Sequence, residues 1–314
     1  MRNNVQRTMC DVQAGESVHS TLHVARSTAK QLIITADDFG LSSGVNRAVE
    51  QAWQGGLLTC ASIMPGAAAF DEAVGIAKRN PGLQVGLHLT LVQGKAVLPP
   101  EQIPGLVDGA GNFSNNPITS GMRYFFDKGL YKQIKREIEA QILKVRAAGI
   151  QLSHIDGHLN IHMHPTVFAF LTELMPCYGI SSFRLAHERL NHNLRFDNQR
   201  ILGKMAEQVI FGALASNSRS HLKRLAIGHA SEVKGVLNSG RMTEEYILNI
   251  LDGLEDGLTE IYFHPGILPD AEITRRMPDY RHMDELAAIT SPRVQQKLKE
   301  LQITVQNYRG DVKC

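Results

Sequence analysis

Short apolar runs alternate with longer amphipathic stretches from Gln31 onward, and no other feature of the sequence restricts the fold as strongly. The apolar runs have the length and composition of strands, and the stretches between them have the periodicity of helices. The first predicted elements are a strand at 32–36, a helix at 45–53, a strand at 57–64, a helix at 70–78 and a strand at 83–89. This order indicates an α/β fold built on a parallel sheet.

The alternation continues toward the C-terminus. Residues 131–148 form the best-defined predicted helix, with apolar residues on one face and Gly149 as a stop signal. Further strands are predicted at 152–156, 182–185 and 259–264, and further helices after Pro165, at 197–214 and from Thr243. Because no glycine-rich dinucleotide fingerprint accompanies these units, a (β/α) barrel is favoured over a doubly wound sheet.

The predicted domain organisation is a single barrel domain at residues 31–314. Residues 1–30 are polar and lack an apolar period, which predicts a flexible N-terminal extension. Insertions are predicted near 94–122, a Gly-, Pro- and Asn-rich functional loop or lid, and near 187–229. The second insertion suits either a solvated helical face or a substrate mouth. It contains the basic residues Arg189, Arg195, Arg200, Arg219, Lys223 and Arg224.

Composition disfavours several classes of function. The 33 basic and 31 acidic residues leave a formal net charge of +2, so charge does not predict binding to nucleic acid. The four cysteines have no CxxC spacing, which fits a reducing compartment better than a disulfide framework or a thiolate metal site. No apolar run reaches the roughly 18 residues that span a bilayer, and the first residues lack a signal-peptide core. The expected location is therefore the cytoplasm.

Two adjacent carboxylates, Asp37 and Asp38, follow the first predicted strand directly. The C-terminal end of a barrel strand lies on the catalytic face. Because neighbouring carboxylates repel unless a cation or a proton compensates, a metal site explains the pair. The alternative is that Asp38 starts a turn and caps the helix after Leu41.

Two histidines also end predicted apolar strands. His88 lies in the run VGLHL, and His264 is followed by a Pro-Gly turn. Taken alone, a strand histidine is more often a hydrogen-bonded core residue than a ligand. Because parallel barrel strands deliver their C-terminal ends to one face, both histidines are expected beside Asp37 and Asp38.

A histidine-rich segment, HIDGHLNIHMH, covers residues 154–164. In an extended backbone the even-numbered positions share one face, so these side chains are predicted to project together. Gly157 and Pro165 argue against a long helix and favour a strand leading into a loop. Helical chelation by histidines four residues apart, or a solvated polar loop, are the alternatives.

The chemistry that fits these residues is metal-assisted hydrolysis. One carboxylate and two imidazoles on a divalent cation leave positions for water and a substrate carbonyl. A second carboxylate can take a proton from the water, and a further histidine can protonate a leaving nitrogen.

These segments resemble the YdjC-like carbohydrate deacetylase family and, more narrowly, its hopanoid biosynthesis-associated (HpnK-type) branch. The matching segments run in the expected order from about Leu32 to Gly266: ITADDFGLSSGVNRAVE, LLTCASIM, VGLHLTLVQGKAVLPP, HIDGHLNIHMHPTV, SFRL and TEIYFHPG. The resemblance implies an irregular (β/α) barrel related to polysaccharide deacetylases. It also implies removal of an N-acetyl group from an amino sugar, which for the hopanoid branch is an N-acetylglucosaminyl hopanoid.

The resemblance also implies the role of each site residue. The implied metal ligands are Asp38, His88 and His158, with Asp37 as the catalytic base and His264 assisting the leaving amine. The implied cofactor is one divalent metal ion, usually magnesium in the family, although an Asp-His-His set suits zinc better. The family commonly has a histidine where this chain has Asn160, which cannot carry a proton in the working pH range.

Alternatives with other substrates or classes are open. A soluble chitooligosaccharide such as diacetylchitobiose would use the same five residues with different pocket walls. A non-catalytic metal- or sugar-binding module would not need Asp37, and a phosphohydrolase is disfavoured because no glycine-rich phosphate loop is found. A lipid-linked amino sugar would imply peripheral contact with the inner membrane, with apolar residues of 94–126 as its approach or as core. A homo-oligomer is left open.

Overall fold

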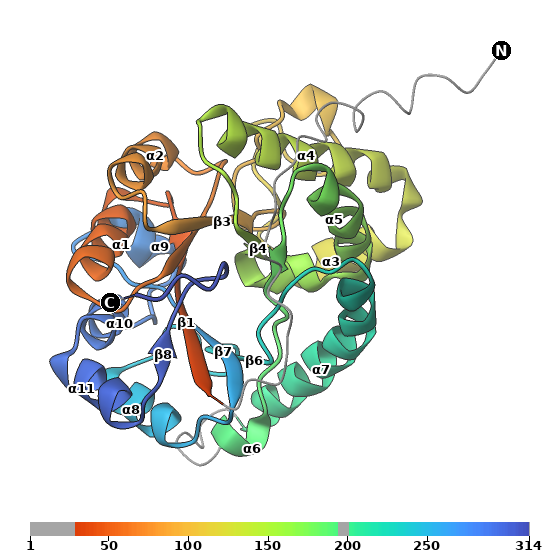
Figure 1. Ribbon diagram of the computed structural model, residues 1–314. Helices are drawn as coiled ribbons and strands as arrows, with labels where there is room; N and C mark the ends of the chain where they lie inside the picture. Colours follow the sequence, from red (N-terminus) through yellow and green to blue (C-terminus); the bar gives the residue numbers. More distant parts are fainter. Residues whose placement is uncertain (1–28, 194–200, 314) are drawn as a thin grey trace.

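The computed structural model describes residues 29–193 and 201–313, and its eight strands form one sheet (Figure 1). Every strand pair is parallel, in the order β5-β4-β3-β2-β1-β7-β6, with β8 beside β1. The strands are β1 (Lys30–Phe39), β2 (Cys60–Ile63), β3 (Gln84–Leu89), β4 (His154–Gly157), β5 (Ser182–Phe183), β6 (Glu232–Lys234), β7 (Gly257–Phe263) and β8 (Thr304–Val305).

The sheet curls into an irregular barrel (Figure 1). The two ends of the strand path, β5 and β6, are linked through neighbouring residues. Ser182 forms a parallel bridge with Gly228, and the Val233 amide donates to the His187 carbonyl at 3.0 Å. The predicted α/β fold with an irregular (β/α) barrel is confirmed.

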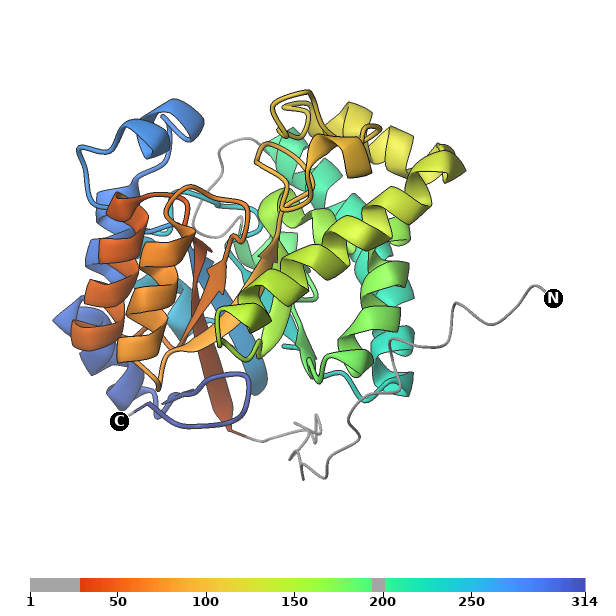
Figure 2. The ribbon, with the colours of Figure 1, turned by 90° about the horizontal axis from the view of Figure 1, so that it is seen from above.

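Helices connect the strands and cover the outside of the sheet (Figure 2). The α-helices are α1 (Ser43–Gly55), α2 (Phe70–Arg79), α3 (Pro117–Phe126), α4 (Tyr131–Ala147), α5 (Pro165–Cys177), α6 (Leu190–Asn193), α7 (Ile201–Arg224), α8 (Glu244–Asp252), α9 (Ala271–Arg276), α10 (His282–Ile289) and α11 (Pro292–Glu300). Three 3₁₀ segments are η1 (Pro100–Gln102), η2 (Lys128–Leu130) and η3 (His158–Met163). Among the described residues, no helix combines the length and apolar character needed to cross a membrane.

The periodicity of α4 shows why the sequence pattern produces this layer. Ile134, Ile138, Ile142 and Val145 are all fully buried, at 0% exposure, against the sheet. Burial of each such side chain contributes about 1.5–3 kcal/mol, which a charged residue at the same position would forfeit. The strands themselves are buried on both faces, as expected for a parallel sheet covered by helices.

The predicted insertions have structure of their own. Within 94–122, the bridges Lys95–Asn112 and Val107–Phe113 fold the segment back on itself. Its residues Ile103, Leu106 and Phe113 are buried in the core, so they do not form an open apolar approach. Most of the second insertion is α7, which is longer than the predicted helix at 197–214. Residues 194–200 lie outside the described residues.

Several elements are absent from the sequence-based prediction. Strands β6 and β8 have only three and two residues, too few to produce a periodic signal. Helices α10 and α11 follow the last predicted strand and were likewise not predicted. Residues 1–28 lie outside the described residues, so the N-terminal extension and the single domain at 31–314 stay predictions.

Candidate metal and catalytic site

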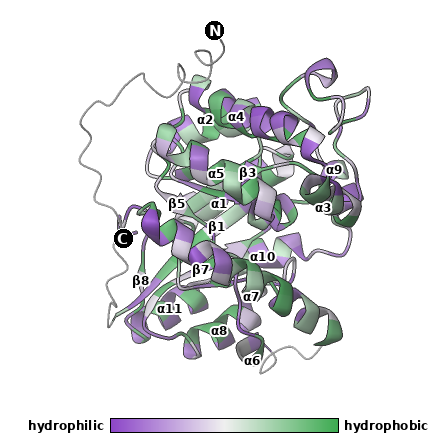
Figure 3. Ribbon diagram, turned by 90° about the vertical axis from the view of Figure 1, so that its right-hand side faces the viewer, coloured by the Kyte–Doolittle hydropathy of each residue, from purple (hydrophilic) through white to green (hydrophobic). Residues whose placement is uncertain are grey.

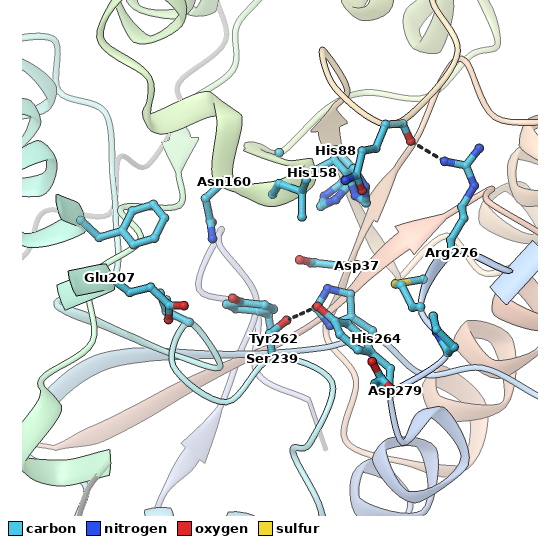
Figure 4. A pocket seen from close by; sticks show the side chains of 18 residues that line it. Asp37, His88, His158, Asn160, Glu207, Ser239, Tyr262, His264, Arg276 and Asp279 are labelled. Atoms are coloured by element: carbon cyan, nitrogen blue, oxygen red, sulfur yellow. Dashed lines mark hydrogen bonds between the residues drawn. The ribbon is translucent and has the colours of Figure 1, made fainter. Parts of the chain in front are cut away.

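A pocket of about 420 Å³ lies at the C-terminal ends of the central strands (Figure 4). Asp37 from β1, His88 from β3, His158 after β4 and His264 after β7 all line it. Asp38 is buried beside His88 and His158 and is 1% exposed. The structure therefore brings together all five residues singled out in the sequence.

A bulge at the end of β1 gives the two adjacent aspartates different surroundings. In a regular strand their side chains would point to opposite faces of the sheet. The β1–β2 register shifts between Ala36 and Phe39, and Asp38 has a φ of 61°, a left-handed conformation that aspartate tolerates better than most residues. This local turn carries the Asp38 carboxylate to the imidazoles while Asp37 faces the pocket.

Asp38, His88 and His158 converge as a metal site would require. Asp38 Oδ1 lies 3.2 Å from His88 Nε2 and 3.1 Å from His158 Nδ1. Asp38 Oδ2 is buried with no hydrogen-bond partner among the described residues. An unpaired buried carboxylate oxygen is costly, and a cation would satisfy it. This donor set therefore fits a divalent metal ion.

A second cluster, formed by Asp37, His88 and Asp156, also has ligand atoms close together. Its carboxylate oxygens are already occupied, however. Asp156 Oδ1 accepts from His88 Nδ1 at 2.8 Å, and Asp156 Oδ2 accepts from Ser62 at 2.5 Å. A proton on His88 Nδ1 leaves the Nε2 lone pair directed at the first cluster, the arrangement of a metal-bound histidine with a carboxylate behind it.

The electrostatics of the site favour positive charge between the carboxylates. Burial would raise the pKa of Asp38, but His158 and His88 hold it well below its usual value. Burial would likewise lower the pKa of His88, but the carboxylates of Asp156 and Asp38 raise it to about 10. A divalent cation would supply the same positive charge at this point.

Arg184 is a buried arginine that pairs with three carboxylates of the site. It is 1% exposed and follows β5 directly. Its Nη1 and Nη2 donate to the two oxygens of Asp37 at 2.6 and 2.8 Å, and it also pairs with Asp156 and Glu260. Burial would lower the pKa of Arg184, but Asp156, Asp37 and Glu260 raise it well above its usual value. A permanently charged planar group thus fixes the Asp37 carboxylate.

His264 faces Asp37 across the pocket (Figure 4). Its backbone amide donates to Glu285 Oε2 at 2.5 Å, and its carbonyl accepts from His282 Nδ1 at 2.7 Å. Burial lowers the pKa of His264 and raises the pKa of Glu285 to about 7. Glu285 and His282 of α10 therefore fix the main chain of His264 and with it the position of the His264 imidazole.

The predicted common face of residues 154–164 is wrong beyond Gly157. Leu159 and Asn160 have φ values of 52° and 54°, so the backbone turns within η3 and the strand alternation ends. His158 stays in the pocket. His162 instead donates from Nε2 to the Arg184 carbonyl at 2.9 Å, and His164 from Nε2 to the Gly121 carbonyl at 3.0 Å.

His154 lies on the inner side of the barrel, away from the pocket. Its ring bonds Ser62 Oγ at 3.1 Å and stacks on Tyr308. Gly86 makes room for it, because a Cβ there would lie 2.4 Å from the ring. Burial lowers the pKa of both His154 and His162 to about 3, so these two histidines are neutral core residues.

The remaining walls of the pocket come from segments far apart in the sequence. Glu207 and Phe211 of α7 line one side, and Arg276 at the end of α9 lines the other. None of residues 94–122 lines the pocket, so the predicted loop or lid does not form its wall. The Asn160 amide points into the pocket and has no partner among the described residues (Figure 4).

Within the described part of the second insertion, α7 lines the pocket mouth and no basic residue does. Arg189 pairs with Glu255 at 2.6 Å, and Arg224 bonds His221 at 2.8 Å, both on exposed surface. Arg195 and Arg200 lie outside the described residues.

Arg184, Asp156 and Glu285 were not predicted as site residues. Arg184 follows a strand end, the same position that identified His88 and His264, and this signal could have found it. Asp156 lies inside the histidine-rich segment. Nothing in the sequence around Glu285 marks it, because its contacts are with distant main-chain amides.

A barrel with an Asp-His-His set and a second aspartate at the strand ends defines a class of candidate metal-dependent hydrolases. The family model described as YdjC-like protein matches residues 31–300, and the chain belongs to this family. A carbohydrate deacetylase of Brevibacillus brevis is 28% identical over 279 residues, covering 88% of this chain and 98% of the relative. A carbohydrate deacetylase of Listeria monocytogenes is 36% identical over 151 residues, covering 48% and 59%.

Among solved structures, one from Enterococcus faecalis V583 superposes with a TM-score of 0.70 and 26% identity, covering 89% of this chain and 98% of that one. Its name proposes cellobiose-phosphate cleavage. The resemblance drawn from the sequence is confirmed at the level of the family.

Proposed function

We propose that the protein is a metal-dependent carbohydrate deacetylase that hydrolyses the N-acetyl amide of an amino sugar. The observation that carries the proposal is the position of Asp37 between the His88–His158 pair and His264 (Figure 4). The names of the Brevibacillus and Listeria relatives support the substrate class.

Asp38, His88 and His158 would hold the metal ion. A divalent ion with open positions lowers the pKa of a bound water and polarises a carbonyl. Zinc suits one carboxylate and two imidazoles by ligand preference, and magnesium is the metal implied by the family resemblance.

In the proposed reaction, Asp37 accepts a proton from the water that attacks the acetyl carbonyl carbon. A C–O bond forms and the C–N bond then breaks, with its electron pair leaving on the sugar nitrogen. His264 donates the proton that this nitrogen needs, and the products are acetate and a free amino sugar. Because burial lowers the pKa of His264, its protonated form gives up the proton readily.

We further propose that the substrate is lipid-linked, as in an N-acetylglucosaminyl hopanoid. Large apolar side chains are exposed on α3 and in the first half of α7. Both helices contain hydrophobic residues, drawn green in Figure 3, and α3 lies on the side of the barrel toward which the strands point (Figure 2). A pocket for a soluble sugar has no need of the exposed side chains, whereas a lipid or membrane surface would cover them. These residues are Ile118, Met122, Phe125 and Phe126 on α3, and Leu202, Met205, Val209 and Ile210 on α7.

The test is acetate release from N-acetylglucosaminyl bacteriohopanetetrol and from diacetylchitobiose, with metal-loaded and chelated enzyme. Metal-dependent release with preference for the lipid supports both parts of the proposal. Release from diacetylchitobiose alone keeps the deacetylase and rejects the lipid. Release from neither substrate, by protein shown to hold metal, rejects deacetylation and favours a binding module.

A further inference from the structure

The segment after α11 places a tyrosine inside the barrel, beyond residue 300 where the family match ends. Strand β8 pairs with the start of β1, and the Gln306 amide donates to the Leu32 carbonyl at 2.9 Å. Tyr308 follows and is 3% exposed. Its ring stacks on His154, with centroids 4.2 Å apart and an interplanar angle of 26°.

The Tyr308 hydroxyl begins a chain of hydrogen bonds that ends at Asp37. It donates to Glu260 Oε2 at 2.5 Å. The other oxygen, Glu260 Oε1, accepts from Arg184 Nε and from Thr35 Oγ1, each at 2.9 Å. Nη1 and Nη2 of the same guanidinium donate to the two oxygens of Asp37, and Nη2 also lies 2.9 Å from Glu260 Oε1. Tyr308 is therefore joined to the proposed catalytic base without a break.

We propose that Tyr308 is a positioning residue for the deacetylation: by fixing Glu260, it sets the orientation of the Arg184 guanidinium that aligns Asp37. The inference rests on the proposed function. Its physical basis is the rigidity of the guanidinium, since a planar group anchored at Nε can rotate little at Nη1 and Nη2. An alignment error of about 1 Å at a catalytic group can lower turnover by about 100-fold.

The Tyr308 hydroxyl also influences when Glu260 carries charge. The charged and titratable groups facing Glu260 are Arg184, Tyr308, Asp156 and Cys60. Burial raises the pKa of Glu260, whereas Arg184 and the Tyr308 hydrogen bond lower it. Without the hydroxyl, Glu260 takes up a proton at a higher pH, and a neutral Glu260 anchors the guanidinium less firmly.

The tail that carries Tyr308 has anchors independent of the hydroxyl. Lys313 Nζ donates to the carbonyls of Trp53 and Leu58, each at 2.7 Å, and lies 4.1 Å from the Trp53 ring centroid. Tyr308→Phe would keep these anchors and the stacking on His154. It therefore removes the hydrogen bond without removing the segment.

The experiment compares Tyr308→Phe with wild type and with Tyr246→Phe. Tyr246 is a matched control, because it is also buried and its hydroxyl accepts a hydrogen bond from Asn193 at 2.6 Å, away from Arg184. For Tyr308→Phe we expect kcat for acetate release to fall roughly ten-fold, with KM nearly unchanged. The acidic limb of its kcat–pH profile should also move to higher pH. Tyr246→Phe should show neither effect.

A crystal structure of Tyr308→Phe gives a readout that does not depend on activity. A displaced or rotated Arg184 guanidinium supports the positioning role, and an unmoved Arg184–Asp37 pair overturns it. If wild type is active and Tyr308→Phe has the same kcat and the same pH profile, the positioning role is overturned as well. If wild type releases no acetate, the proposed function fails. A moved Arg184 guanidinium in the Tyr308→Phe crystal would still show that Tyr308 positions Arg184, so the two failures can be told apart.

Discussion

Arg184 donates two hydrogen bonds to Asp37, at 2.6 and 2.8 Å, while the adjacent Asp38 is contacted by two imidazoles instead. Two neighbouring carboxylates thus have different partners. Asp37 is held by the Arg184 guanidinium and faces the pocket, whereas one buried oxygen of Asp38 has no hydrogen-bond partner within 29–193 and 201–313. This division is the structural basis for assigning proton transfer to Asp37 and metal binding to Asp38.

Arg184→Lys should lower kcat by about 100-fold, because a point charge cannot hold both oxygens of Asp37 in a fixed plane. Metal content should stay near that of wild type, since the Arg184 side chain pairs with Asp37, Asp156 and Glu260 and not with Asp38 or His158. Steady-state kinetics and metal analysis check both. Arg189→Lys, at an exposed pair with Glu255, is the control. A kcat equal to wild type would show that Asp37 needs no such alignment.

Asn160→Gly should raise KM roughly five-fold, corresponding to about 1 kcal/mol for one lost hydrogen bond to the sugar. Glycine adopts the left-handed backbone of Asn160 without strain, so the substitution removes the amide and little else. Gln302→Gly, at a distant left-handed position with φ 53°, controls for added chain flexibility. An unchanged KM in Asn160→Gly would mean that the amide does not contact the substrate.

His162 should make the protein less stable as pH falls. Burial lowers its folded-state pKa to about 3 from 6.5, so between these values the unfolded chain binds a proton that the folded chain does not. The contribution of neutral His162 to the free energy of unfolding is therefore fully present above pH 6.5 and is lost as pH falls toward 3. We expect the wild-type melting temperature to drop between pH 7 and pH 5.

His162→Gln keeps a donor toward the Arg184 carbonyl and should reduce this drop, although buried His154 contributes in the same direction. His221→Gln, at an exposed position, should leave the drop unchanged. An equal pH dependence in wild type and His162→Gln would contradict the burial argument.

Ile118→Ser combined with Phe126→Ser should weaken turnover of the lipid-linked substrate and leave diacetylchitobiose turnover unchanged. The two side chains are 78% and 68% exposed, so their loss costs the fold little, while a lipid would lose its apolar contact. The measurement is the ratio of kcat/KM for the two substrates. Leu143→Ser, an exposed position on α4, is the matched control. If both substrates respond equally, α3 is not a lipid contact.

The residues at strand ends could be predicted from the sequence, because parallel topology alone brings them to one edge. Asp37, His88 and His264 each follow an apolar run, and the structure places all three in the pocket. The histidine-rich segment could not be predicted in the same way. Its alternation is valid only while the backbone stays extended, and the left-handed pair Leu159 and Asn160 ends it.

Contacts between distant segments leave no periodic signal in one sequence. Arg184 and Asp37 are 147 positions apart, and Glu260 meets Tyr308 across 48. In the sequence, each of these four residues is an ordinary charged or aromatic residue in or beside a strand. The barrel brings β1, β7 and the chain after β5 together around one centre. Only this packing joins the four residues in a hydrogen-bond network.

The most direct test of the central claim measures metal content and acetate release together in wild type, Asp37→Asn and Asp38→Asn. Asp37→Asn should bind metal as wild type does and release almost no acetate, whereas Asp38→Asn should lose both metal and acetate release. Acetate release at the wild-type rate by metal-loaded Asp37→Asn would contradict the account, since Asp37 would then not be the group that takes the proton from water.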